Sequence, residues 1–249
     1  MRQLLASLFF LSLTISCQNS QNSKPVSAKE IVNQAIEFSG TSAVDNSVIE
    51  FDFRNLHYRS EATCNGMKLS RQKGDTIDVL YSGKFKRFID SIPVEVNDSL
   101  KNVYSESINS VHYFVQLPYR LTDQAVNLRR LPNQSFNNQN FYVVEVNFDQ
   151  ENGGQDFNDT YLYWFNQSDY SLDYLAYEFH VNGGGYRFRV AKNRQFINGT
   201  QFIDYDNYKP KSKQVELEDL LQLFHNNKLE LVSEIQTENP SINLVQLKC

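Results

Sequence analysis

Alternation of apolar and polar residues with a period of two is the feature that most constrains this chain. That period is typical of strands with one buried face, because successive side chains point to opposite faces of a sheet. Asn198-Gly199, Lys73-Gly74-Asp75 and Ser82-Gly83 separate such segments and are typical of tight turns, whereas Asn65-Gly66 reads as a bulge or a turn. Strands are expected over 48–54, 62–69, 76–81, 84–89, 126–131, 140–148, 160–165, 172–180, 186–191, 195–197 and 200–205, and a final strand over 229–235 would follow these. The pattern predicts antiparallel meanders.

Three segments have helical spacing instead. Ser27 and Glu30 form a capping box at the start of a helix over 27–40, and Gly40 marks its end. A second amphipathic helix is expected over 98–115 and ends before Pro118. A short third helix over 216–224 has one apolar stripe, made of Leu217, Leu220, Leu221 and Phe224.

This set of elements restricts the fold class to mainly β, of the α+β kind. About ten or eleven strands are too many for a small sandwich and too antiparallel for a βαβ fold. A large curved antiparallel sheet wrapped around helices satisfies the count, since large twisted sheets tend to curl. We expect one domain over residues 27–249.

The first 26 residues predict export and a lipid anchor. One basic residue precedes the apolar run from Leu4 to Ile15, which is typical of a secretory signal and too short for a permanent membrane span. Ser16-Cys17 at the end of that run resembles the bacterial lipobox, although Thr14 stands where that pattern prefers Leu. We therefore expect a signal peptide over 1–16, a lipid on Cys17, and a disordered tether over 17–26. An ordinary signal peptide with a chance cysteine is the alternative.

Two other cysteines, Cys64 and Cys249, remain if Cys17 carries lipid. In an oxidising compartment they would form a disulfide; two unpaired thiols are the alternative, which the sequence leaves open. The chain carries 24 basic and 29 acidic residues, a net charge of -5, with no concentrated basic stripe. This composition argues against nucleic acid as a partner, and Arg129-Arg130 and Arg187/Arg189 are interpreted as solvated charge.

Motifs for catalysis or for a metal or other cofactor do not stand out. The four histidines lack metal-ligand spacing, and no serine lies in a GxSxG elbow. The acidic segment 149–156 departs from the EF-hand pattern at Gly153, so a long hairpin loop is the simpler interpretation. Asp204 and Asp206 share one face of a strand but are interpreted as ordinary surface carboxylates. We therefore expect a protein that is not an enzyme and has no cofactor or metal.

Aromatic residues are the better candidates for a ligand site. Tyr161, Tyr163 and Phe165 lie on one face of an expected strand, and Leu162 and Trp164 lie on the other. A strand that is apolar on both faces has both faces covered. Tyr161, Tyr163, Trp164 and Phe165 therefore line either a cavity or a packed core. Leu217, Leu221 and Phe224 of the third helix would then cover the open side of the sheet as a lid.

The opening helix, with Ala28-Lys29-Glu30-Ile31-Val32, Ala35-Ile36 and Gly40, resembles the start of LolA-like envelope proteins. The segment Tyr113-Phe114-Val115-Gln116-Leu117-Pro118-Tyr119-Arg120-Leu121 is similar to uncharacterised LolA-like lipoproteins of Bacteroidota. The resemblance implies an unclosed β-barrel with helices over its open side. It also implies an acyl-chain ligand in the cavity, and the lipid anchor resembles LolB or LppX more than the soluble LolA.

Three functions follow as hypotheses. The first is a periplasm-facing outer-membrane lipoprotein that binds or carries a lipid, an acyl chain or a lipoprotein; Gln18, in place of Asp after the cysteine, favours the outer membrane by resemblance. The second is an envelope scaffold with a packed core and no ligand. The third is an unrecognised hydrolase. A large apolar cavity would favour the first, and a packed interior the second.

Overall fold

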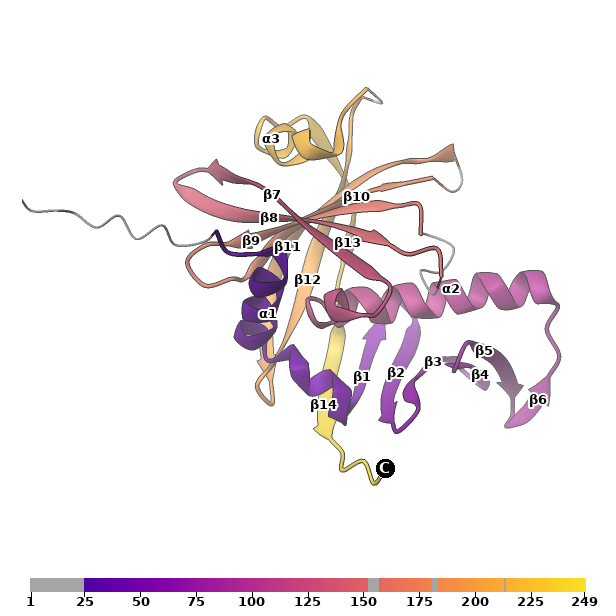
Figure 1. Ribbon diagram of the computed structural model, residues 1–249. Helices are drawn as coiled ribbons and strands as arrows, with labels where there is room; N and C mark the ends of the chain where they lie inside the picture. Colours follow the sequence, from indigo (N-terminus) through magenta and orange to yellow (C-terminus); the bar gives the residue numbers. More distant parts are fainter. Residues whose placement is uncertain (1–24, 152–156, 181–182, 213) are drawn as a thin grey trace, which may run out of the picture.

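The computed structural model describes residues 25–151, 157–180, 183–212 and 214–249. The expected signal peptide, Cys17 and most of the tether lie outside these residues. Within them, the fold consists of two antiparallel sheets of seven strands each, with helices packed against them (Figure 1). The predicted class, mainly β with an antiparallel and unclosed arrangement, is confirmed.

We call the two sheets A and B. Sheet A has the order β14-β1-β2-β3-β4-β5-β6, and sheet B has the order β13-β12-β11-β10-β9-β8-β7. The strands of sheet A are β1 (Ser47–Phe53), β2 (Leu56–Thr63), β3 (Gly66–Lys73), β4 (Thr76–Tyr81), β5 (Lys84–Ile89), β6 (Ile92–Val94) and β14 (Glu238–Leu244). Those of sheet B are β7 (Val126–Phe136), β8 (Gln139–Phe148), β9 (Thr160–Asn166), β10 (Leu172–Phe179), β11 (Gly185–Ile197), β12 (Thr200–Pro210) and β13 (Leu229–Ile235).

The helices are α1 (Ala28–Ser39), α2 (Asp98–Val115) and α3 (Leu220–His225), with 3-10 turns at Thr41–Asn46, Tyr119–Thr122 and Leu217–Asp219. α2 lies across the molecule between sheet B and strands β1 to β6 (Figure 1). In the described part of the chain, none of the helices combines the length and apolarity needed to cross a bilayer.

The capping box predicted for α1 is confirmed. The Ser27 side chain accepts from the backbone amide of Glu30, and the Glu30 carboxylate accepts from the backbone amide of Ser27 at 2.7 Å. Gly40 ends the helix with a φ of 64°, a left-handed conformation that favours glycine. A Cβ at this position would also meet the carbonyl oxygen of Gly199 at 2.0 Å, so the close approach of α1 to the β11–β12 turn needs glycine.

Sheet B is covered on both faces. On one face, α1 and the end of α2 pack against the first core cluster, which includes Tyr161, Tyr163 and Phe165 of β9. On the other face, α3 packs against the second cluster, which includes Leu162 and Trp164 of the same strand. The expectation that this strand has both faces covered is confirmed. A third cluster joins sheet A to α2 and the turn at Thr41–Asn46.

Several predicted boundaries are wrong. The segment 62–69 is not one strand, because a turn at Cys64-Asn65 ends β2, and β3 begins at Gly66. Segments 186–191 and 195–197 belong to the single strand β11, which continues through a bulge between Lys192 and Gln195. A bulge inserts residues into one strand without ending its pairing, so alternation is lost while the ladder continues.

The last strand, β14, was not predicted, and it pairs with the first strand, β1. β13 belongs to sheet B, but β14 pairs with β1 in sheet A, with Ile242 opposite Ile49. Cys249 lies just beyond β14 and forms a disulfide with Cys64 in the β2–β3 turn, with an S–S distance of 2.05 Å. The bridge joins residues 185 positions apart, so it ties the segment after the edge strand β14 to the turn between β2 and β3.

Candidate ligand-binding site

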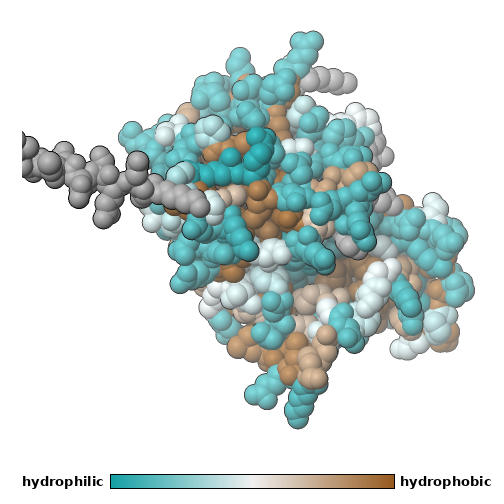
Figure 2. Space-filling model, in the orientation of Figure 1, coloured by the Kyte–Doolittle hydropathy of each residue, from teal (hydrophilic) through white to brown (hydrophobic). Residues whose placement is uncertain are grey.

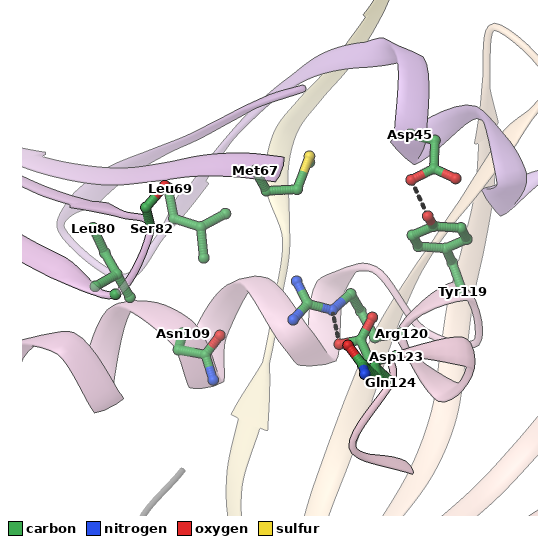
Figure 3. Close-up of a pocket in the computed structure, with 11 residues that line it drawn as sticks. Asp45, Met67, Leu69, Leu80, Ser82, Asn109, Tyr119, Arg120, Asp123 and Gln124 are labelled. Carbon is green, nitrogen blue, oxygen red and sulfur yellow. Dashed lines mark hydrogen bonds and ion pairs between the residues drawn. The ribbon is translucent and has the colours of Figure 1, made fainter. Parts of the chain in front are cut away.

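Two cavities flank α2, and they differ in how their charged groups are paired. The first, of about 470 Å³, lies between α2 and sheet A (Figure 3). Met67, Leu69 and Leu80 form its apolar wall, and Asp45, Tyr119, Arg120 and Asp123 form its polar end. The Tyr119 hydroxyl donates to Asp45, and Arg120 Nε donates to Asp123 at 2.7 Å.

The guanidinium at the polar end of the first cavity is therefore already paired with a carboxylate of the same lining. Burial raises the pKa of the Asp123 carboxyl, against the lowering effect of the neighbouring Arg120 guanidinium. Arg120 also lies 5.7 Å over the ring of Tyr113. With Arg120 already paired and two carboxylates against one guanidinium, the polar end of this cavity offers a ligand no free cation.

The second cavity, of about 310 Å³, lies where α2 meets both sheets. Its volume falls at the lower end of the range of small-molecule sites, roughly 300–1,000 Å³. Three parts of the fold line it. α2 contributes Ser107, Ser110, Val111, Phe114 and Val115, and the β1–β2 hairpin contributes Phe53, Arg54, Leu56 and Tyr58. Sheet B contributes Arg189, Asn207, Ser233 and Ile235, and the segment after β13 contributes Thr237. We call it the α2 cavity. It combines apolar walls with a few polar groups, the usual composition of a small-molecule site.

A row of residues crosses sheet B at one level, and its three polar members Arg189, Asn207 and Ser233 line this cavity. Leu175 of β10 lies opposite Tyr163 of β9 on one side and opposite Arg189 of β11 on the other. Arg189 lies opposite Asn207 of β12, which in turn lies opposite Ser233 of β13. Directly opposed residues of adjacent strands project to the same face of a sheet, so the row is a property of the strand register.

Arg189 is the most unusual member of the row. It is only 8% exposed, and its guanidinium lies 3.8 Å over the ring of Phe114 from α2. One of its terminal nitrogens donates to the Tyr177 hydroxyl at 3.3 Å, while its Nε lacks an acceptor within the described residues. The Asn207 side-chain oxygen is likewise buried without a partner there.

The sequence interpretation of Arg189 as solvated charge is wrong. The strand it belongs to is covered by α2 on one face and by α3 on the other, so an arginine that points inward is largely buried. A signal was available: Phe188 and Val190 make the same segment apolar on the second face, as in β9. Arg187, two positions away, lies over the ring of Phe179 and is partly exposed.

The predicted site residues are placed mainly in the cores. Tyr161, Tyr163 and Phe165 belong to the first cluster, and Trp164, Leu217, Leu221 and Phe224 belong to or pack against the second. Of this set, Tyr161 lines a third and smaller cavity beside α2, of about 60 Å³, and none of the set lines the two larger ones. α3 lies on the face of sheet B opposite α2, and its apolar stripe contacts packed side chains there.

Asp204 and Asp206 both have structural partners. Asp204 accepts from the backbone amide of Thr237 at 2.8 Å, and Asp206 pairs with Lys192. Within the described ranges, no group of three or more His, Cys, Asp or Glu side chains could hold a metal ion. The segment 149–156 that resembles a calcium loop lies mostly outside those ranges.

Hydrophilic residues cover most of the face shown in Figure 2, and hydrophobic residues appear on it in separate patches. The two cavities beside α2 are thus better candidates for a site than this outer surface.

Comparison with known proteins gives one sequence family and a set of structural neighbours. A model described as "Family of unknown function (DUF6503)" matches residues 6–237. Among curated proteins, no sequence match was found.

Several solved structures have a similar fold. A LolA superfamily protein from Nitrosomonas europaea is 16% identical, with 90% of this chain and 94% of that chain covered and a TM-score of 0.42. A putative outer-membrane lipoprotein-sorting protein domain from Vibrio parahaemolyticus is 14% identical, with 89% and 95% covered and a TM-score of 0.44. The lipoprotein LppX from Mycobacterium tuberculosis is 10% identical, with 64% and 91% covered and a TM-score of 0.24.

Proposed function

The chain belongs to DUF6503, a family of unknown function, and from its own cavities we propose that it is a non-enzymatic envelope lipoprotein that binds an amphipathic molecule. The site is the α2 cavity. The lipid anchor is Cys17, and the protein faces the periplasm from the outer membrane.

The observation that carries this proposal is the lining of the α2 cavity. Val111, Phe114 and Val115 on α2, with Ile235 on β13, give it apolar walls, whereas Arg189 and Asn207 give it buried polar atoms without partners in the described chain. A buried polar group without a hydrogen bond costs about 1–3 kcal/mol, and a polar ligand group in the cavity would supply the missing partners. A ligand with an apolar and a polar part satisfies both halves of the lining.

A pair of matched variants on α2 tests the proposal. Ser110 lines the α2 cavity and Asn109 lines the cavity on the sheet A side; both are half-buried and both also border the small third cavity. Ser110→Phe fills the α2 cavity, so a fluorescent fatty-acid probe should bind the delipidated variant about tenfold more weakly, equivalent to about 1.4 kcal/mol. Asn109→Phe should leave probe affinity close to that of the wild type.

Equal loss of affinity in the two variants would place binding elsewhere, and no binding to the delipidated wild type would remove the proposal. The scaffold hypothesis would then lead, since three packed clusters fill most of the interior. Native mass spectrometry of gently purified protein gives an independent check, because a retained lipid appears as an added mass.

A further inference from the structure

Arg189 is a buried cation without a carboxylate partner in the described part of the chain. Its backbone position and its neighbours place the guanidinium at the α2 cavity, with the Nε hydrogen free to donate. Two other largely buried arginines behave differently: Arg71 and Arg87 both pair with Asp78, at 3.0 Å and 2.6 Å. The two arginines of sheet A therefore share a carboxylate as counter-charge, whereas Arg189 of sheet B has none among the described residues.

Stacking on aromatic rings offsets only part of the cost. The guanidinium lies 3.8 Å over the ring of Phe114 and 5.4 Å from that of Tyr177. Such contacts stabilise a cation only modestly, whereas the burial of a charge without a partner is strongly unfavourable. A positive charge with a free donor remains at the cavity wall.

The rest of the lining fits an anion. The α2 cavity has two arginines, Arg54 and Arg189, and no Asp or Glu among its described lining residues. Asn207 lies directly opposite Arg189 and binds the Ser233 hydroxyl through its amide nitrogen at 3.2 Å. Because a hydroxyl can donate or accept, the amide keeps this bond in either orientation and can present its NH₂ group to the cavity as a second donor.

We infer that the α2 cavity holds the anionic head group of an amphipathic ligand, a carboxylate or a phosphate on an apolar chain, with Arg189 as its counter-charge and Asn207 as a second hydrogen-bonding group. The inference rests on the proposed function and specifies its ligand class. The apolar chain of the ligand lies against Val111, Val115 and Ile235.

Three probes with the same chain separate head group from tail: dodecanoate, dodecyl phosphate and the uncharged dodecanol. Each is titrated against a bound fluorescent fatty acid on the purified, delipidated protein. We expect at least one anion to bind about tenfold or more tightly than dodecanol, because a hydrogen bond between charged partners is stronger than one to a neutral hydroxyl. The tighter of the two anions identifies a carboxylate or a phosphate as the head group.

Two variants locate this preference. Arg189→Met keeps the apolar stem and removes the charge, so anion and alcohol should bind equally while dodecanol affinity is retained. Asn207→Asp places a carboxylate opposite Arg189, so it should abolish the anion preference and raise the melting temperature. Arg187→Met is the matched control, because Arg187 lies on the same strand outside the lining of the α2 cavity.

The outcomes are distinct. Equal binding of the three probes to wild type, or an anion preference that survives in Asn207→Asp and in folded Arg189→Met, overturns this inference and leaves the proposed function intact. No binding of any probe to wild type overturns both. If Arg189→Met does not fold, Asn207→Asp alone decides between these results.

Discussion

Several buried titratable side chains, on α2 and on sheet B, are held in their neutral forms. Burial raises the pKa of the hydroxyls of Tyr113, Tyr163 and Tyr205, so these phenols remain protonated. Burial likewise lowers the pKa of His112 to about 4, although its hydrogen bond to the Ser70 carbonyl opposes the shift. That carbonyl accepts from Nε2 at 3.1 Å, so the proton of the neutral ring lies on Nε2.

His112 predicts a pH dependence of stability. Its folded pKa of about 4 lies below the ordinary histidine pKa of 6.5, so between these values the unfolded chain binds more protons than the folded one. Stability should therefore be complete above pH 6.5 and fall by about 3 kcal/mol as the pH drops toward 4. Chemical denaturation at a series of pH values measures this.

His112→Gln is the control, because its amide can still donate to the Ser70 carbonyl but does not titrate. The difference in slope between wild type and variant over this window isolates the histidine. Parallel curves would mean that His112 does not protonate on unfolding in this range.

At the scale of elements, α3 and α2 divide the two faces of sheet B between them. Leu220 and Leu221 of α3 are buried in the second cluster with Trp164 and Phe188, while Phe114 of α2 packs on the opposite face. α3 has six residues and no side-chain cap, so its own hydrogen bonds cannot sustain it, and packing must stabilise it.

Leu221→Ala should therefore lower the free energy of unfolding by roughly 2–5 kcal/mol and leave the affinity for a fatty-acid probe unchanged. Thermal unfolding and probe titration measure the two quantities. Gln222→Ala, at an exposed neighbouring position, is the control and should change stability by less than about 0.5 kcal/mol. A loss of probe affinity in Leu221→Ala as large as in Ser110→Phe would instead make α3 the lid of a ligand cavity.

At the scale of the whole molecule, segments far apart in the sequence are joined within sheet A. β14 returns to pair with β1, and the Cys64–Cys249 bridge fixes the terminus beside the β2–β3 turn. With these two cysteines joined to each other, Cys17 is the remaining one of the three cysteines in the sequence. This arrangement supports its proposed use as the lipid attachment site.

Cys17→Ser should abolish metabolic labelling of the protein by a fatty-acid analogue, because the acceptor thiol is removed. Cys64→Ser is the matched control and should keep the label, since it affects the bridge and not the anchor. Labelling of Cys17→Ser as strong as that of wild type would contradict the anchor. Fractionation of cells shows in parallel whether membrane association follows the label.

Local patterns of the sequence determined much of the fold. The capping box of Ser27 and Glu30, the Gly40 stop and the Asn198-Gly199 hairpin involve residues within a few positions of one another, and the structure confirms each. The period of two likewise reports a strand and its alternating faces, whatever the strand pairs with. The fold class and the coverage of both faces of β9 follow from such patterns.

Only the tertiary structure decided where the strands meet and which groups face one another. β14 contains Pro240 and has a partner 190 or so positions earlier in β1, so no local pattern reveals the pair. Arg189 looks like a surface charge in the sequence, because the residues that bury it, Phe114 and Tyr177, come from another helix and another strand. Its environment depends on side chains brought together by long-range pairing, and so does the candidate site.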